Sequence, residues 1–203
     1  MADSSRGGLW TPANIVTLVR VALLPLWLLL AELSPAVRGG AALVSPWVVL
    51  VVYVLISLTD KLDGHLARSR GEITTFGKFL DPIADKLAVL VALCYLLEVH
   101  LVSPWVLLIV LSREFLVSGL RMVVASHGVV VAASNLGKWK TATTMIALCG
   151  LLGLLCVTDG PVHFALWWIS YVMLAVACVL TAWSGIDYAV KSWNLMSEES
   201  DGR

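Results

Sequence analysis

Three stretches of the sequence contain no Asp, Glu, Lys or Arg and are long enough to cross a lipid bilayer as helices, namely Ala41 to Thr59, Thr141 to Thr158 and Pro161 to Ile186. A spanning helix needs about 20 mostly apolar residues. A fourth stretch, Asn14 to Ala31, is interrupted only by Arg20, and Ile83 to Val124 has room for two more spans with a break near His100 to Pro104. Apolar residues make up 59% of the chain, which excludes an ordinary soluble domain. The sequence therefore predicts an all-α, polytopic membrane protein with six transmembrane helices.

The two ends of the chain are more polar than these spans. Residues 1–13 are expected to form a short cytoplasmic or interfacial segment, residues 14–190 one six-helix membrane domain, and residues 191–203 a polar C-terminal tail. Arg6 is the only basic residue before the first apolar stretch, and no Ala-x-Ala cleavage pattern follows that stretch. We therefore interpret that stretch as a retained anchor rather than a secretion signal.

The distribution of basic residues predicts the orientation of the chain in the membrane. If the N-terminus lies in the cytoplasm, six spans place Arg38 outside and the other Lys and Arg residues on or near the inner side. This bias is what the positive-inside rule requires. Both termini and the polar stretch between the second and third spans should therefore face the cytoplasm.

That polar stretch contains four aspartates, Asp60, Asp63, Asp81 and Asp85. On a helix, the first two share a face with Gly64 and Ala67, since these positions follow the i, i+3, i+4, i+7 pattern. Gly77 and the last two aspartates recur at intervals of four and share a face of the next helix. Two carboxylate pairs can therefore meet across a contact between two helices, and the small residues allow a ligand or backbone to approach closely.

Any one of these aspartates has an ordinary explanation. Asp81 followed by Pro82 fits a helix N-cap with a first-turn proline, and Asp60 and Asp63 can be water-facing charges. Four together favour a binding site, because unit charges about 4 Å apart repel by about 4 kcal/mol at an effective dielectric constant of about 20. All-oxygen ligands suit Mg²⁺ or Mn²⁺ rather than zinc, and four carboxylates suffice for two ions.

A metal pair at a membrane surface indicates phosphoryl chemistry, in which the ions neutralise charge on the attacking and leaving oxygens. Arg68 and Thr74 lie in the same stretch and can hold phosphate oxygens.

The spacing Asp60-x2-Asp63-Gly64-x2-Ala67-Arg68-x8-Gly77-x3-Asp81-x3-Asp85 resembles the signature of the CDP-alcohol phosphotransferase family at every fixed position. Four flanking strings are similar to the bacterial phosphatidylglycerophosphate synthase branch of that family: NIVTLVR, GKFLDPIADKL, REFLVSGLR and GKWKT. The resemblance implies a homodimeric six-helix enzyme of a bacterial-type inner or plasma membrane. It would transfer the phosphatidyl group of CDP-diacylglycerol to sn-glycerol 3-phosphate and release CMP, with no nucleic-acid partner.

The resemblance also implies roles for individual residues. Asp60, Asp63 and Asp81 would bind the metals, and Asp85 would complete the second metal site and act as the catalytic base. The CDP portion would contact Gly64, Ala67, Arg68, Thr74 and Gly77.

Charged residues inside the spans provide candidates for the acceptor site. Arg113 and Glu114 fall in the middle of a span, where a charge costs about 3 kcal/mol. They need either an ion-pair partner, for which Arg20 is a candidate, or a substrate. A dianionic acceptor such as glycerol 3-phosphate requires basic contacts, and the candidates near the acidic stretch are Arg20, Arg113, Arg121, Lys138 and Lys140.

Other functions remain open from the sequence. Within the same enzyme class, the acceptor can be phosphatidylglycerol, which gives cardiolipin, or inositol phosphate. In a different class, the acidic cluster can belong to a cation transporter, although transporters more often place acids at the midplane on broken helices with internal repeats.

Overall fold

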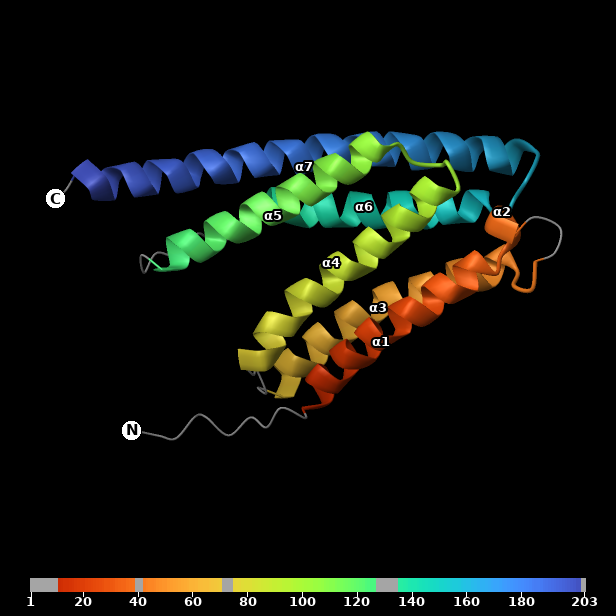
Figure 1. Ribbon diagram of the computed structural model, residues 1–203, viewed down its shortest axis with the longest axis horizontal. Coiled ribbons are helices and arrows are strands. Elements are labelled where there is room, and N and C mark those ends of the chain that lie inside the picture. Colours follow the sequence, from red (N-terminus) through yellow and green to blue (C-terminus); the bar gives the residue numbers. More distant parts are fainter. Residues whose placement is uncertain (1–10, 39–41, 71–74, 127–134, 202–203) are drawn as a thin grey trace. The chain divides into compact units, whose positions relative to one another are not determined.

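The computed structural model describes residues 11–38, 42–70, 75–126 and 135–201 (Figure 1). Within these ranges, it describes side chains except those of residues 13, 38, 60–70, 75–79, 81–82, 124–126, 135–136, 138 and 194–201. All regular structure in the described ranges is helical: α1 Pro12–Glu32, α2 Pro35–Arg38, α3 Pro46–Arg70, α4 Thr75–Glu98, α5 Pro104–Ser126, α6 Asn135–Leu154 and α7 Pro161–Asp201. The all-α prediction is therefore confirmed for this part of the chain.

Prolines mark most of the helix starts. Five of the helices, α1, α2, α3, α5 and α7, begin at a proline, because the first helical position needs no backbone N–H and suits the fixed φ of proline. The side chain of Thr11 caps α1 by accepting a hydrogen bond from the backbone nitrogen of Asn14 at 3.3 Å. The predicted break in the stretch from Ile83 to Val124 is confirmed, since α4 ends at Glu98 and α5 begins at Pro104.

Two helical stretches among the described residues are long and apolar enough to cross a membrane, Asn14–Glu32 and Pro161–Trp193. Pro46–Thr59 and Trp139–Leu154 are shorter apolar helices. Helices α4 and α5 each contain several charged residues, so composition alone does not identify them as spans. The chain is an apolar, helical membrane protein, and the count of six spans stays a prediction.

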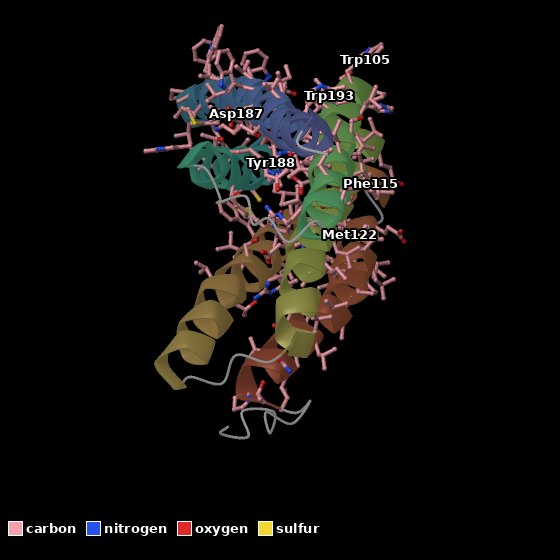
Figure 2. All side chains as sticks on the ribbon, turned by 90° about the vertical axis from the view of Figure 1, so that its left-hand side faces the viewer. Trp105, Phe115, Met122, Asp187, Tyr188 and Trp193 are labelled. Carbon is pink, nitrogen blue, oxygen red and sulfur yellow. The ribbon has the colours of Figure 1, made fainter. Side chains whose placement is uncertain are left out.

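Large apolar side chains cover the outside of the helices. On α5, Trp105, Phe115 and Met122 are 71%, 73% and 73% exposed, and Figure 2 shows them projecting away from the ribbon. Soluble proteins rarely expose so many large apolar groups together. This surface suits contact with lipid chains.

The chain divides into two compact units. The first comprises Met1–Val99 with Leu152–Thr158, and the second comprises His100–Leu151 with Asp159–Arg203. In the first unit, α1 packs along both α3 and α4 (Figure 1).

One face of α1 is buried along its whole length. Its residues follow helical spacing and are at most 3% exposed: Thr17, Arg20, Leu24, Trp27 and Ala31. The Trp27 ring lies 5.2 Å from Tyr53 of α3 and 5.7 Å from Tyr95 of α4, and its Nε1 donates to the Val49 carbonyl at 2.8 Å. An aromatic cluster thus joins the three helices at one level, and Arg20 lies two turns of α1 away.

In the second unit, α7 packs along α5 (Figure 1). The Tyr171 hydroxyl of α7 donates to the Leu101 carbonyl, which precedes α5, at 2.9 Å. Between α6 and α7 the approach is close, because a Cβ at Gly150 would lie 2.3 Å from the Ser170 Oγ. Helix α7 continues as far as Asp201, through most of the residues predicted to form a tail.

Candidate active site

The four predicted metal ligands lie on two consecutive helices. Asp60 and Asp63 are in the last turns of α3, and Asp81 and Asp85 are in the first half of α4. The backbone is helical at all four positions, as the spacing argument assumed. The side chains of the first three lie outside the described residues, so the meeting of the two pairs stays a prediction.

The predicted CDP contacts fall in the same part of the chain. Gly64, Ala67 and Arg68 are on α3, and Gly77 is on α4, but their surroundings are outside the described part. Thr74 lies between the two helices and outside the described residues altogether. The short connection keeps the end of α3 within about 19 Å of the start of α4, since consecutive Cα atoms are about 3.8 Å apart.

Asp85 is the one aspartate of this set whose side chain is described. Its Oδ1 accepts a hydrogen bond from Arg20 Nη1 at 2.9 Å. The two partners are buried very differently, because the Arg20 side chain is 1% exposed and the Asp85 side chain is 49% exposed. A carboxylate that can reach water or substrate is therefore held by a cation that cannot.

The same guanidinium also contacts α3. Arg20 Nε donates to Thr59 Oγ1 at 3.3 Å, and Thr59 Oγ1 donates in turn to the Ile56 carbonyl at 2.6 Å. Thr59 directly precedes Asp60 in the chain. Arg20, predicted as one contact of the acceptor phosphate, thus bridges the two helices of the acidic motif, and its part in acceptor binding stays a prediction.

The donor chemistry of the acidic motif fits a hard divalent cation. Carboxylate oxygens are the ligands that Mg²⁺ and Mn²⁺ prefer. Within the part of the chain whose side chains are described, no group of three or more His, Cys, Asp or Glu residues could hold a metal. Three of the four predicted ligands lie outside that part, so this finding does not bear on them.

A second charged cluster lies in the second unit. Glu114 Oε1 of α5 accepts from Arg113 Nη1 at 3.0 Å and also from Lys140 Nζ of α6. Arg113 Nε donates to Ser184 Oγ of α7 at 3.2 Å. All three charged side chains are largely buried, with 14% to 16% exposure. This cluster therefore joins three helices, and in its described contacts two cations share one carboxylate oxygen.

The other predicted acceptor contacts are less defined. Arg121 is exposed on α5, and the Lys138 side chain lies outside the described residues. Sequence reasoning identified the need of Arg113 and Glu114 for partners, and the structure provides Lys140 and Ser184. It missed Thr59 and Ser184, whose only signal was a hydroxyl group within an apolar stretch, as is common where helices contact one another in membranes.

Comparison with known proteins extends over most of the chain. The family model for CDP-alcohol phosphatidyltransferase matches residues 10–183. A protein of Bacillus subtilis named CDP-diacylglycerol–glycerol-3-phosphate 3-phosphatidyltransferase is 37% identical over 189 residues, which cover 90% of this chain and 95% of the relative. A protein of the same name from Yersinia pestis is 39% identical over 188 residues, with 90% and 95% covered. A probable phosphatidylglycerophosphate synthase of Mycobacterium tuberculosis is 37% identical over 180 residues, with 89% and 80% covered.

Proposed function

Because the chain belongs to the CDP-alcohol phosphatidyltransferase family, we propose that it transfers the phosphatidyl group of CDP-diacylglycerol to sn-glycerol 3-phosphate. The products are phosphatidylglycerophosphate and CMP, which places the enzyme in phospholipid biosynthesis. The observation that carries this choice of acceptor is the name shared by relatives that are 37% to 39% identical and cover 90% of this chain.

The reaction breaks the phosphoanhydride bond of the CDP group and forms a phosphoester bond to the acceptor. A hydroxyl oxygen of the acceptor attacks the phosphorus that carries the diacylglycerol group, and a new P–O bond forms. The P–O bond to the CMP phosphate breaks, and CMP leaves with the bonding electrons. The hydroxyl proton passes to a base, for which we propose Asp85, because its carboxylate is half exposed and anchored by Arg20.

Four carboxylates are proposed to hold two Mg²⁺ or Mn²⁺ ions, namely those of Asp60, Asp63, Asp81 and Asp85. Bound there, the metals would supply charge stabilisation for the phosphate oxygens. The CDP portion is proposed to contact five residues of the same motif: Gly64, Ala67, Arg68, Thr74 and Gly77. Among these, Arg68 contributes a positive charge for phosphate oxygens, and the small residues leave room for the nucleotide.

The acceptor phosphate is proposed to bind the cluster of the second unit. Arg113 and Lys140 are cations that are largely shielded from water, which strengthens their attraction for a dianion. Glu114 keeps the two cations close together before the acceptor arrives. Arg121 and Lys138 are further candidates on the same two helices.

The membrane arrangement is proposed from the charge pattern. Six spans would place the acidic motif and both chain termini on the cytoplasmic face of a bacterial inner or plasma membrane, consistent with the positive-inside rule. A homodimer is proposed as the working form. Substituted-cysteine labelling of intact cells and chemical cross-linking in membranes would test these two proposals.

The function itself is tested with purified protein in detergent. CDP-diacylglycerol and Mg²⁺ are supplied with one labelled acceptor at a time: glycerol 3-phosphate, phosphatidylglycerol, inositol phosphate or glycerol. We expect release of CMP and labelled lipid only with glycerol 3-phosphate. Product with another acceptor alone would move the chain to another branch of the family, and no product with any of them would contradict the proposal.

A further inference from the structure

We propose that Arg20 is a positioning residue that sets the spacing between the two helices of the acidic motif. The inference rests on the proposed function only in taking that motif to be the reaction centre. It assigns Arg20, which lies outside the motif and on a different helix, a role other than binding the acceptor phosphate.

The contacts of Arg20 join the two ends of the motif. Its Nη1 holds Asp85, the last aspartate, at 2.9 Å, and its Nε contacts Thr59, the residue before the first aspartate, at 3.3 Å. These two positions are on α4 and α3, and α1 packs along both helices. Arg20 of α1 therefore reaches both helices close to the aspartates.

The chemistry of the side chain suits this role. A guanidinium group is planar, so the directions of its Nε and Nη1 donors are fixed relative to each other. Arg20 is 2% exposed, so water cannot easily replace either partner. Thr59 is itself held by its hydrogen bond to the Ile56 carbonyl at 2.6 Å. Asp85, Arg20 and Thr59 thus form a defined link from α4 through α1 to α3.

Positioning and charge balance lead to opposite expectations for cation binding. If Arg20 acted only as a counter-ion to the aspartates, its removal would leave them more negative and would tighten the binding of a divalent cation. If Arg20 positions them, its removal would loosen that binding, because partners that orient metal ligands typically contribute about 10- to 100-fold in affinity.

The experiment measures Mn²⁺ binding to the purified full-length protein by electron paramagnetic resonance, without lipid or nucleotide. The variants are Arg20→Gln, Arg20→Lys and Thr59→Val, and the control is Lys191→Gln, which removes a positive charge from an exposed side chain of α7. We expect the Mn²⁺ Kd to rise at least about 10-fold in both Arg20 variants, to rise less for Thr59→Val, and to stay unchanged for the control. Lysine keeps the charge but not the rigid fork, so Arg20→Lys separates geometry from charge.

Melting temperatures and kinetics complete the test. If Arg20→Gln does not fold, the milder Thr59→Val variant still reports on one arm of the link. A positioning role lowers kcat with little change in the KM for glycerol 3-phosphate, whereas direct phosphate binding raises that KM. Mn²⁺ binding by Arg20→Gln that equals or exceeds the wild-type affinity overturns the inference, as does a wild-type protein that binds no Mn²⁺.

The two proposals can fail separately. If wild-type protein makes no product from glycerol 3-phosphate but the Arg20 variants lose Mn²⁺ affinity, the proposed acceptor is wrong and the positioning role holds. If product forms and the variants keep their Mn²⁺ affinity, the proposed function holds and the positioning role is wrong.

Discussion

The two charged clusters of this protein are built in different ways. In the first unit, a cation that is 1% exposed holds a carboxylate that is 49% exposed. In the second unit, the arginine, lysine and glutamate are all 14% to 16% exposed and share one carboxylate oxygen. The first cluster has a buried anchor and an accessible acid, whereas the second is evenly shielded and holds two cations on one carboxylate oxygen.

This difference indicates a division of chemical work. An accessible carboxylate that is anchored by a buried arginine is suited to proton transfer or to metal binding, because its position is defined and a ligand can reach it. An evenly shielded cluster that contains two cations is suited to holding an anion, because low exposure to water strengthens the attraction between opposite charges. Substitutions in the two clusters should therefore affect different kinetic constants.

The largest effect is expected for Asp85→Asn. The amide keeps the size of the side chain and can still accept a hydrogen bond from Arg20, but it cannot take a proton. We expect kcat to fall by about 10²- to 10⁴-fold, the usual contribution of a general base, while binding of CDP-diacylglycerol is retained. Turnover measurements and equilibrium binding of the nucleotide lipid would check this, and an active variant would remove Asp85 from the role of base.

The next largest effect is expected for Lys140→Gln. Loss of the ammonium group removes one charged hydrogen-bond donor from the second cluster, and such bonds contribute about 1.5–3 kcal/mol. We expect the KM for glycerol 3-phosphate to rise about 10-fold or more, with the KM for CDP-diacylglycerol unchanged. Lys191→Gln is the matched control, because Lys191 is exposed and pairs with Asp187 one turn away on α7. An equal rise in both KM values would show that the two clusters do not divide the work in this way.

The helices of both clusters could be predicted from the sequence, but their pairings could not. Runs of apolar residues and the spacing of the aspartates determine which residues form helices and which share a face, since both are local properties. Arg20, which binds Asp85, is 65 positions away from it in the chain, and Lys140, which binds Glu114, is 26 positions away from it. Such contacts depend on which helix packs opposite, and a periodic pattern on one helix does not contain that information.

Arg20 shows the same limit. A lone arginine in an apolar stretch predicts a need for a partner. The sequence also shows Asp85, but it does not indicate that the two residues pair. Thr59 is uncharged, and a hydroxyl in an apolar span often bonds only to its own helix, so the sequence contains no sign of its contact with Arg20. The bridge from α4 to α3 through one guanidinium is therefore a finding of the structure.

A smaller effect is expected for Gly150→Ala, which tests the frame of the second cluster. The new Cβ would lie 2.3 Å from Ser170 Oγ and 3.2 Å from Ser170 Cβ, so α6 and α7 must separate or Ser170 must move. Overpacking of this kind costs about 1–3 kcal/mol. We expect a lower melting temperature in detergent and partial recovery in the Gly150→Ala/Ser170→Ala double variant.

Gly119→Ala is the control for this steric argument. It makes the same chemical change on α5, where an added Cβ meets nothing within 4 Å. A helical glycine replaced by alanine without a clash is expected to be neutral or slightly stabilising. Equal losses of stability in the two variants would mean that the close approach of α6 and α7 does not limit the second unit.

The smallest effect is expected for Ser184→Ala, the counterpart of Thr59→Val. Each substitution removes one hydroxyl that accepts a hydrogen bond from a buried arginine, Arg113 in one case and Arg20 in the other. A single such bond contributes about 1 kcal/mol, so we expect the KM for glycerol 3-phosphate to rise by a few-fold in Ser184→Ala, with Mn²⁺ affinity unchanged. Thr59→Val should weaken Mn²⁺ binding and leave the KM for glycerol 3-phosphate unchanged. Measuring the Mn²⁺ Kd and this KM in both variants therefore tests whether the two clusters act separately. If Ser184→Ala weakened Mn²⁺ binding as much as Thr59→Val does, the two clusters would act as one site rather than two.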